Sequence, residues 1–529
     1  RSYKAYASTG TLVSGDRGTY SDTSTQSKNT YADAIATLNK SFNDWSVNVN
    51  LGVSLSDSRY EMIGYEGGLK LINFFAVHNI DFNKAWKAKQ SGWHDQTRAI
   101  FANAEIGWKS MIYLTATGRN DWDSRLAFSD YKSFFYPSIG LSAILTSMFN
   151  APDWLTYLKV RGSYTEVGNS YGRFMTTVTY PYDEQTQSWT STSSYPNTKL
   201  KPERTKSWEV GLDARILNDI SLNLTYYRSN TYNQTFYADL SLSSGYSNIP
   251  IQSGNIMNEG LEMSLGYNKQ WKDFSFNTNY TLTWNKNRVK RLADGVYNYA
   301  TGQPIQMPEL SPLTYGHTDA RLILRVGGSM GDVYGQRLLK RDLNGYILNE
   351  EGVGLAMENK ETYLGSILPK MNMGWSLGFG YKGVNLGMTF TGRFGGIVIS
   401  ETQSVLDAAG VSKVSADVRD AGGVQINQSK VSAQTYYQTI QGTAAYYTYS
   451  ATNVRLGELS LSYTLPKKWF DNKVGMTVGL VGKNLWMIYC KAPFDPELTT
   501  SAASNFYQGF DAYMLPSTRN FGFNVKFQF

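Results

Sequence analysis

Alternation of apolar and polar residues recurs along the whole chain and predicts a protein built of β-strands. In 45–55 the odd positions are Trp, Val, Val, Leu, Val and Leu, with Ser, Asn and Gly between them. The same period of two returns in 208–216, 261–267, 373–381 and 384–390. Successive side chains of a strand point to opposite faces, so each segment has one apolar and one polar face. The helical period of about 3.6 residues is nearly absent.

The pattern predicts about 18 strands, most of them about 9 to 14 residues long. A tilted strand needs about 9–11 residues to cross a bilayer, whereas strands of soluble sheets usually have about five or six. The predicted strands lie near 2–13, 28–39, 44–57, 97–108, 110–120, 134–146, 155–167, 205–216, 219–232, 258–269, 273–286, 319–327, 332–341, 371–382, 384–395, 453–465, 475–486 and 519–529.

Short and long connections alternate between the predicted strands. Short turns follow residues 39, 108, 216, 269, 327, 382 and 465. Long loops are predicted near 58–96, 168–204, 233–257, 287–318, 342–370, 396–452 and 487–518. Outer-membrane barrels have short periplasmic turns and long outer loops, and lipid requires a spanning sheet to close on itself. We therefore predict that 1–529 is one all-β domain, a transmembrane antiparallel β-barrel that passes the outer membrane many times.

The last predicted strand carries an apolar stripe. A large apolar residue occupies every second position, and the other positions are polar or Gly. We expect this stripe to face lipid and to act as a C-terminal signal for barrel assembly. Its residues are Phe521, Phe523, Val525, Phe527 and Phe529. Further upstream, the apolar positions change parity between Leu456 and Leu459, which predicts a β-bulge at Gly457.

Composition fits a barrel and excludes several other classes. The chain has 529 residues, 14% of them aromatic, and 41% are hydrophobic. The longest apolar run, 69–77, is interrupted by polar residues and is too short for a membrane helix, which needs about 20 residues. The net charge of +7 is spread along the chain, so no nucleic-acid partner is expected. Cys490 is the single cysteine, which excludes an internal disulfide and a cysteine-based metal cluster.

The first residues already read as strand, and no signal peptide opens the sequence. We therefore expect a mature fragment whose upstream part is absent.

Several segments together resemble one family in their order and spacing. They lie at 158–164, 167–169, 200–213, 258–262, 331–335, 455–463, 482–485, 494–497 and 515–519. Examples are Asn258-Glu259-Gly260-Leu261-Glu262 and Phe494-Asp495-Pro496-Glu497. In this set the chain resembles the C-terminal barrel portion of a SusC/RagA-type TonB-dependent transporter of the Bacteroidota.

The resemblance implies a barrel of about 22 strands with a plugged lumen. About four strands, the plug domain and the N-terminal motif that engages TonB are then expected outside this chain. It further implies active import of an oligomeric nutrient, a glycan or a peptide, across the outer membrane. The implied partners are a SusD-like lipoprotein lid, TonB through the missing plug part, the barrel assembly machinery and outer-membrane lipid.

Enzymatic chemistry is not expected from the sequence. Gly168-Asn169-Ser170-Tyr171-Gly172 matches G-x-S-x-G, but a nucleophile elbow needs a following helix and a histidine partner, and a long polar loop follows here. His78, His94 and His317 are scattered. Asp342-Leu343-Asn344-Gly345 lacks the further carboxylates of a calcium loop and reads as a hairpin turn. We expect no catalytic residue, no cofactor and no metal site.

Aromatic residues gather in the predicted outer loops. We consider seven as candidate contacts for a substrate or partner, since flat rings give large contact area at low entropic cost. The alternative is that they form the interfacial girdle or pack the loops against each other. The seven are Trp122, Trp189, Tyr436, Tyr437, Tyr446, Tyr447 and Tyr507.

Three other classes of protein remain as alternatives. A passive 18-stranded porin would have an even strand number, as bacterial barrels do. A hydrolase built on an outer-membrane barrel would need a nucleophile and a base, for which no credible pair is present. A soluble adhesin-like β-protein has no reason to alternate short and long loops.

Overall fold

The computed structural model describes residues 1–8, 16–83, 86–183, 188–190, 192–252, 254–292, 302–303, 308–350, 354–498, 500 and 505–529. Within these residues one sheet contains sixteen strands, in the order β1-β2-β3-β4-β5-β6-β7-β10-β11-β14-β15-β22-β23-β28-β29-β31. Each strand pairs with its neighbours along the chain, as in an up-and-down barrel sheet. Parts of the predicted strand 2–13 and of several predicted loops lie outside the described residues.

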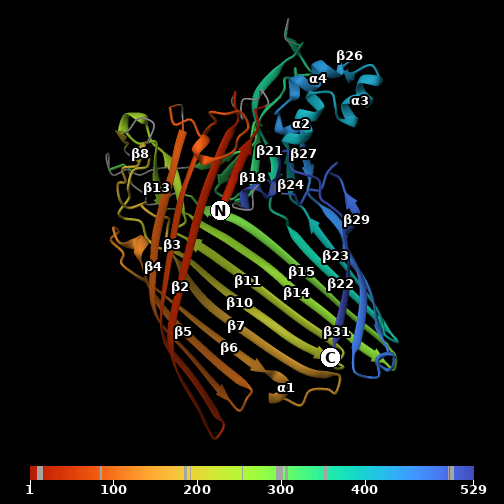
Figure 1. The fold of residues 1–529 in the computed structure, drawn as a ribbon. Helices are drawn as coiled ribbons and strands as arrows, with labels where there is room; N and C mark the ends of the chain where they lie inside the picture. Colours follow the sequence, from red (N-terminus) through yellow and green to blue (C-terminus); the bar gives the residue numbers. More distant parts are fainter. Residues whose placement is uncertain are drawn as a thin grey trace. The chain divides into compact units, whose positions relative to one another are not determined.

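The sixteen strands have the following bounds (Figure 1). They are β1 (Ser2–Tyr6), β2 (Thr19–Phe42), β3 (Trp45–Gly68), β4 (Trp86–Trp108), β5 (Ile112–Asp123), β6 (Phe134–Ile144), β7 (Leu155–Asn169), β10 (Glu203–Ile216), β11 (Ile220–Tyr232), β14 (Asn255–Trp271), β15 (Phe274–Arg291), β22 (Met371–Tyr381), β23 (Val384–Phe394), β28 (Asn453–Leu465), β29 (Gly475–Cys490) and β31 (Asn520–Gln528).

Two predicted membrane strands are wrong. Segments 319–327 and 332–341 form β17 (Arg321–Arg325) and β18 (Asp332–Leu339), which belong to a separate four-stranded sheet. With 5 and 8 residues they are shorter than a spanning strand. Leu322, Ile323 and Leu324 are all buried, so β17 is covered on both faces and presents none to lipid. The prediction of about 18 strands in one sheet is corrected to sixteen within the described residues.

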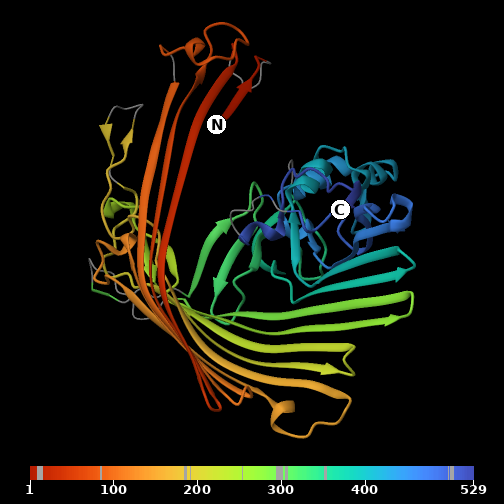
Figure 2. The same ribbon diagram turned by 60° about the horizontal axis from the view of Figure 1, so that its bottom comes forward.

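The predicted loop 58–96 is also wrong, because most of it is strand. β2 and β3 have 24 residues each and β4 has 23. Figures 1 and 2 show these three strands running side by side, and their pairing continues in register beyond Arg59 and His94. Polar residues occupy both faces of this upper part, so the apolar stripe that marks a strand in the sequence is lost there.

The segments between the strands of the large sheet contain small sheets and short helices. The small sheets are built from β8 (Tyr182–Asp183), β9 (Ser188–Trp189), β12 (Thr235–Asp239), β13 (Asn248–Gln252), β16 (Glu309–Thr314), β17, β18, β19 (Asn349–Glu350), β20 (Gly354–Leu355), β21 (Met357–Ser366), β24 (Ile397–Ser400), β25 (Val424–Ile426), β26 (Ser429–Val431), β27 (Thr448–Ser450) and β30 (Phe510–Asp511). The α-helices are α1 (Leu145–Met148), α2 (Glu401–Ala408), α3 (Lys413–Asp420) and α4 (Ala433–Ile440). The 3-10 helices are η1 (Val77–Asn79), η2 (Ser124–Leu126), η3 (Leu242–Ser244), η4 (Ala444–Tyr446), η5 (Lys467–Phe470) and η6 (Asn505–Gly509). None of the helices in the described residues has the length and apolar character needed to cross a bilayer.

Two local predictions are confirmed. Thr389 pairs with Glu458 and Phe390 with Leu456, so Gly457 is the extra residue of a β-bulge. The connection between β22 and β23 consists of Lys382 and Gly383, whose φ angles are 44° and 90°. Two successive positive φ angles are the signature of the tight hairpin turn that matches strand twist.

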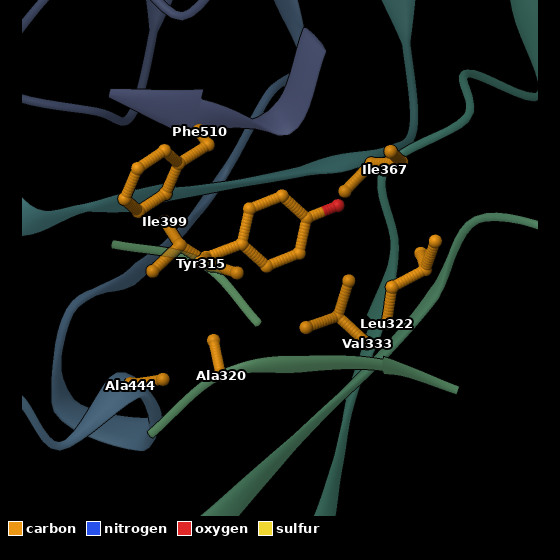
Figure 3. Packing of buried hydrophobic residues seen from close by; sticks show 8 residues of the cluster. All are labelled: Tyr315, Ala320, Leu322, Val333, Ile367, Ile399, Ala444 and Phe510. Carbon is orange, nitrogen blue, oxygen red and sulfur yellow. The ribbon is translucent and has the colours of Figure 1, made fainter. Parts of the chain in front are cut away.

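The chain divides into two compact units. Unit 1 comprises 1–141, 164–206 and 232–253, and unit 2 comprises 142–163, 207–231 and 254–529. The buried hydrophobic residues of unit 2 gather in the loop elements. Figure 3 shows one cluster, in which the Tyr315 ring lies among Ile367, Ile399 and Phe510. A second cluster joins α4 to Leu339, Leu355 and Tyr447.

Candidate functional site

The long strands of unit 1 have one apolar and one polar face. On the apolar face Leu51 lies opposite Ala102, and Val53 lies opposite Ile100. The neighbouring residues point to the other face. There Asn50 of β3 lies opposite Asn103 of β4, which in turn lies opposite Thr117 of β5. Paired residues of neighbouring strands point to the same face. The register therefore makes one face of the sheet apolar and the other polar.

The polar face contains a hollow of about 780 Å³. Its lining includes Asn50, Phe101, Asn103, Arg119, Tyr136 and Glu166. The Phe101 ring lies over Gly52, where an added Cβ would be 2.2 Å from the ring carbon Cζ. Glycine is therefore needed at position 52 for the ring to lie flat on the sheet. The Arg119 guanidinium is 5.7 Å from the centroid of the same ring, within range of a cation–π interaction.

The charged groups of this hollow are paired. Arg119 Nε donates to Asp121 Oδ1 at 2.6 Å, and the Tyr136 hydroxyl donates to Asp121 Oδ2 at 2.8 Å. Glu166 accepts from the Tyr164 hydroxyl at 2.7 Å and from Arg204 at 3.2 Å. The paired charges leave amide, hydroxyl and aromatic groups as the available contacts for a ligand.

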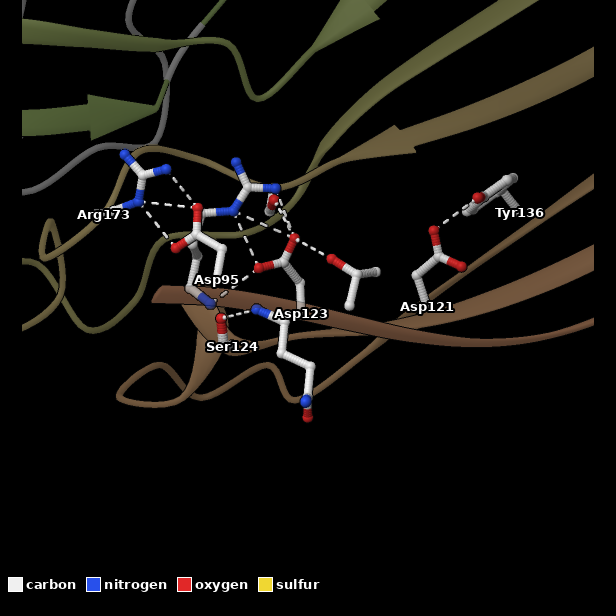
Figure 4. Close-up of polar contacts among 10 residues, drawn as sticks. Asp95, Asp121, Asp123, Ser124, Tyr136 and Arg173 are labelled. Atoms are coloured by element: carbon white, nitrogen blue, oxygen red, sulfur yellow. Dashed lines mark hydrogen bonds and ion pairs between the residues drawn. The ribbon is translucent and has the colours of Figure 1, made fainter. Parts of the chain in front are cut away.

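Above the hollow, ion pairs anchor the loop that follows β7 (Figure 4). Arg173 Nε donates to both carboxylate oxygens of Asp95 at 2.8 Å, and its guanidinium carbon is 3.7 Å from the centroid of the Trp93 ring. Arg125 forms an ion pair with Asp123 at 2.6 Å. The Arg173–Asp95 pair ties this loop to β4, whereas the Arg125–Asp123 pair is local to the end of β5.

Ser170 belongs to this network and is not placed for nucleophilic catalysis. It is buried, and its hydroxyl donates to the Asp123 carboxylate at 2.7 Å. A nucleophilic serine instead donates to a base such as histidine. The serine of the G-x-S-x-G match therefore takes part in the polar network around Asp123.

The seven candidate aromatic contacts are in different environments. Trp122 and Trp189 of unit 1 are exposed, at 45% and 70%. Tyr437 and Tyr447 of unit 2 are buried, at 7% and 2%, and Tyr436 and Tyr446 pack partly buried against the same cluster. Tyr507 packs against Tyr315 with ring centroids 6.1 Å apart. Burial raises the pKa of Tyr447, and it raises that of the nearby Tyr449 to about 12. The unit 2 tyrosines therefore serve loop packing, and the exposed tryptophans remain the accessible candidates.

Four of the five residues of the C-terminal stripe lie on β31, which pairs with β29 in continuous register, and Phe529 directly follows the strand. All five apolar side chains of the stripe are exposed to the surroundings of the protein. Because every residue of β31 is exposed, this exposure does not single out the stripe, and its lipid-facing role and its role in assembly both remain predictions.

Metal ligands do not cluster in the described residues. No three His, Cys, Asp or Glu side chains in this part of the chain are arranged to hold a metal ion.

Sequence reasoning missed the Arg119–Asp121–Tyr136 network. Arg119 and Asp121 are two residues apart, so a strand places both side chains on one face, and this spacing could have indicated that they form a pair. Tyr136 comes from β6. Its place beside Asp121 depends on the register between β5 and β6, which the sequence pattern alone does not determine.

Comparisons with known proteins give a consistent result. A family profile described as "TonB dependent receptor-like, beta-barrel" matches residues 1–485. TonB-dependent receptor P3 of Formosa agariphila is 24% identical over 544 residues, covering 94% of this chain and 52% of that protein. TonB-dependent receptor SusC of Bacteroides thetaiotaomicron is 25% identical over 243 residues, covering 45% of this chain and 22% of SusC.

Solved structures show the same fold. The structure titled the RagAB peptide importer in the "closed-closed" state matches with a TM-score of 0.74 at 18% identity, covering 96% of this chain and 56% of that chain. The chain spans about half the length of receptor P3 and of the solved structure.

Proposed function

This chain belongs to the TonB-dependent receptor-like β-barrel family, and from that premise we propose that it forms the barrel wall of an active nutrient importer. Proteins of this family reside in the outer membrane. The proposed cargo is an oligomeric nutrient, a glycan or a peptide, which moves along the polar face of the sheet. The family profile match over 1–485 is the observation that carries this proposal.

The polar hollow of unit 1 supports an oligomeric cargo. Its volume of about 780 Å³ lies within the range of about 300–1,000 Å³ typical of ligand sites. Glycans and peptides both offer repeated donors and acceptors, which the Asn and Thr side chains of the hollow match. The Phe101 ring adds a flat apolar surface for a sugar ring or a side chain.

The proposed partners follow from the family and from the relatives. One solved structure of the same fold is titled as the RagAB peptide importer. We propose a SusD-like surface lipoprotein as lid for this chain, with Trp189 among its contacts, whereas Trp122 lies on the apolar face opposite Arg98. TonB would supply the energy through the part of the protein that carries the plug. A passive porin would need neither partner.

Uptake of a fluorescent oligosaccharide or peptide by cells carrying the full-length protein is expected to depend on TonB. Deleting TonB or dissipating the proton motive force should reduce uptake to the level of cells lacking the protein. The reason is that a plugged barrel opens only under an applied force. Unchanged uptake in energy-depleted cells would show a passive pore and would contradict active import.

Substitutions at two neighbouring residues of β4 test which face of the sheet binds the cargo. Phe101→Ala should weaken cargo binding by about two- to tenfold, the value of one aromatic contact. Ile100→Ala is the matched control, because Ile100 is 53% exposed on the opposite face of the same strand. Equal losses in the two variants would exclude the polar face as the binding surface.

Deletion of Phe529 is expected to reduce the amount of assembled barrel. The residue ends the exposed apolar stripe of β31, and we propose that this stripe is read during assembly. Heat-modifiable migration of the outer-membrane fraction measures the folded protein. Substituting the polar neighbour Gln528 by Asn serves as control and should leave assembly at the level of the unaltered protein. Normal assembly without Phe529 would remove it from the signal.

A further inference from the structure

The apolar face of unit 1 contains a second hollow, on the side of the sheet that meets lipid. Its volume is about 640 Å³. Four small residues form its floor, and larger apolar side chains form its walls. The floor is Ala34, Ala36, Ala102 and Gly118, and the walls are Leu51, Val53, Ile100 and Phe135. An added Cβ at Gly118 would be 3.1 Å from the Phe135 ring, so the ring lies close over the backbone there. We call these eight residues the lipid-facing groove.

The groove continues toward a group of cations. A neighbouring hollow of about 520 Å³ shares Ala34 and Val53 with the groove and is also lined by Gln96 and Arg98. The register then places Arg98 opposite Leu55 on one side and Trp122 on the other. Two rows of side chains further along the same face, Arg59 lies opposite both Lys28 and His94.

The position of Arg98 matches a membrane interface, and Lys28 and Arg59 lie about 10 Å farther out. Trp45 and Trp108 form a row at the turn end of the strands, with ring centroids 6.4 Å apart. Arg98 lies about ten residues from Trp108 along β4, a rise of about 33 Å along the strand. With a strand tilt of about 40°, this corresponds to about 25 Å across the membrane, the height of the apolar band between aromatic girdles. Because the short turns of such barrels are periplasmic, Arg98 and Trp122 lie at the outer interface.

The cations are only partly neutralised. Asp57 accepts from Arg59 at 3.2 Å and pairs with His94 at 2.6 Å. Arg98 Nε donates to the uncharged Gln96 at 3.1 Å, and within the described residues neither Arg98 nor Lys28 has an ion pair. Like charges directly opposite on neighbouring strands, as in Lys28 and Arg59, are destabilising. An anion bound between them would relieve this repulsion.

One polar group of the groove lacks a partner. Asn120 lines the hollow next to Ile100, one row below Arg98 and Trp122. Its amide nitrogen Nδ2 is buried and has no hydrogen-bond partner among the described residues. An unmade hydrogen bond of a buried donor is costly. The ester carbonyl of a lipid, located just below the headgroup phosphate, has the depth and the chemistry to accept from this amide.

We propose that unit 1 binds an anionic, phosphate-bearing lipid of the outer leaflet at this site. An acyl chain occupies the lipid-facing groove, and Lys28, Arg59 and Arg98 hold the phosphate. The groove alone contributes packing and orientation, because membrane lipid is as apolar as its lining. The cations contribute the selectivity for an anionic headgroup. A free phosphate ion would use the cations but would leave the adjoining groove without a function.

The test measures lipid selectivity of the full-length protein purified in a neutral detergent. Native mass spectrometry follows binding during titration with phosphatidylglycerol and, separately, phosphatidylcholine with identical acyl chains. We expect a clear preference for phosphatidylglycerol. The double variant Arg59→Gln, Arg98→Gln should bind phosphatidylglycerol about 25-fold more weakly, about fivefold for each cation near a lipid headgroup. Phosphatidylcholine binding should be unaffected by these two substitutions.

Controls separate this site from general lipid contact. Lys40→Gln removes a cation from the same face of β2 at the turn end of the strand, opposite Val47, and should leave the preference intact. Ala102→Leu fills the floor of the groove and should weaken long-chain but not short-chain phosphatidylglycerol. Heat-modifiable migration confirms that each variant is folded. Unchanged selectivity in the double variant, an equal loss in Lys40→Gln, or displacement of the lipid by inorganic phosphate alone would overturn the proposal.

Discussion

Replacing Arg455 by Ala is expected to lower the free energy of unfolding by about 3–5 kcal/mol, the usual cost of removing one partner of a buried ion pair. Arg455 donates to both carboxylate oxygens of Asp495, at 3.0 and 2.8 Å. The side chains are only 11% and 8% exposed. The loss leaves the Asp495 carboxylate buried without its cation. Denaturant unfolding in lipid vesicles measures the change, and hydrogen exchange locates it at residues 491–498.

Two further variants separate the pair from general effects of substitution. Arg419→Ala removes an exposed arginine 3.5 Å from Asp420 and should change stability by less than about 0.5 kcal/mol. The double variant Arg455→Met, Asp495→Leu replaces both charges by apolar groups of similar volume and should recover much of the loss. A cost of Arg455→Ala no larger than that of Arg419→Ala would contradict a stabilising role of the pair.

The same pair gives stability a defined pH dependence. Burial raises the pKa of the Asp495 carboxyl, but the hydrogen bonds and charge of Arg455 outweigh this, so its pKa lies below the ordinary value. A carboxyl with a lowered folded-state pKa contributes its full stability above the unfolded-state pKa of about 4. The contribution is lost as the pH falls below about 4 and through the folded-state pKa. In Arg455→Ala this acid-dependent loss should disappear.

The membrane strands were the predictable part of the fold, because lipid on one face leaves a period-two pattern in the sequence. The hairpin of β22 and β23 is an example, since its apolar stripes flank a two-residue turn at Lys382 and Gly383. The upper halves of β2, β3 and β4 were missed for the same reason. Around Arg59 and His94 polar residues occupy both faces, so strand pairing continues without the pattern that reveals it.

The loop region was less predictable, because its structure depends on contacts between distant segments. Helices α2, α3 and α4 have 8 residues each, too few for a clear helical period. Tyr437 and Tyr447 were candidate contacts by composition, yet they are buried against Leu339 and Leu355 from elsewhere in the chain. Segments 455–463 and 494–497 both carry the family resemblance, but the pairing of Arg455 with Asp495 depends on a contact across 40 residues that no local pattern indicates.

The packing around Tyr315 leads to the second large expected effect. Tyr315 is fully buried, its ring centroid is 5.1 Å from that of Phe510, and its hydroxyl donates to the Phe506 carbonyl at 2.6 Å. Tyr315→Ala should lower the free energy of unfolding of the loop region by about 3–5 kcal/mol, the cost of deleting a buried aromatic ring. The segments that would separate are those carrying Leu322 and Ile399, which pack in the same cluster.

Tyr315→Phe is the matched control, because it keeps the ring and removes only the hydroxyl. Its expected cost is about 1–3 kcal/mol, since the Phe506 carbonyl loses its donor. Limited proteolysis and hydrogen exchange of the outer loops measure both variants, with the migration of the folded barrel as a reference. The barrel strands should keep their protection in both, because the described residues that form this cluster belong to loop elements. If Tyr315→Ala leaves loop protection unchanged, the cluster does not hold these segments together.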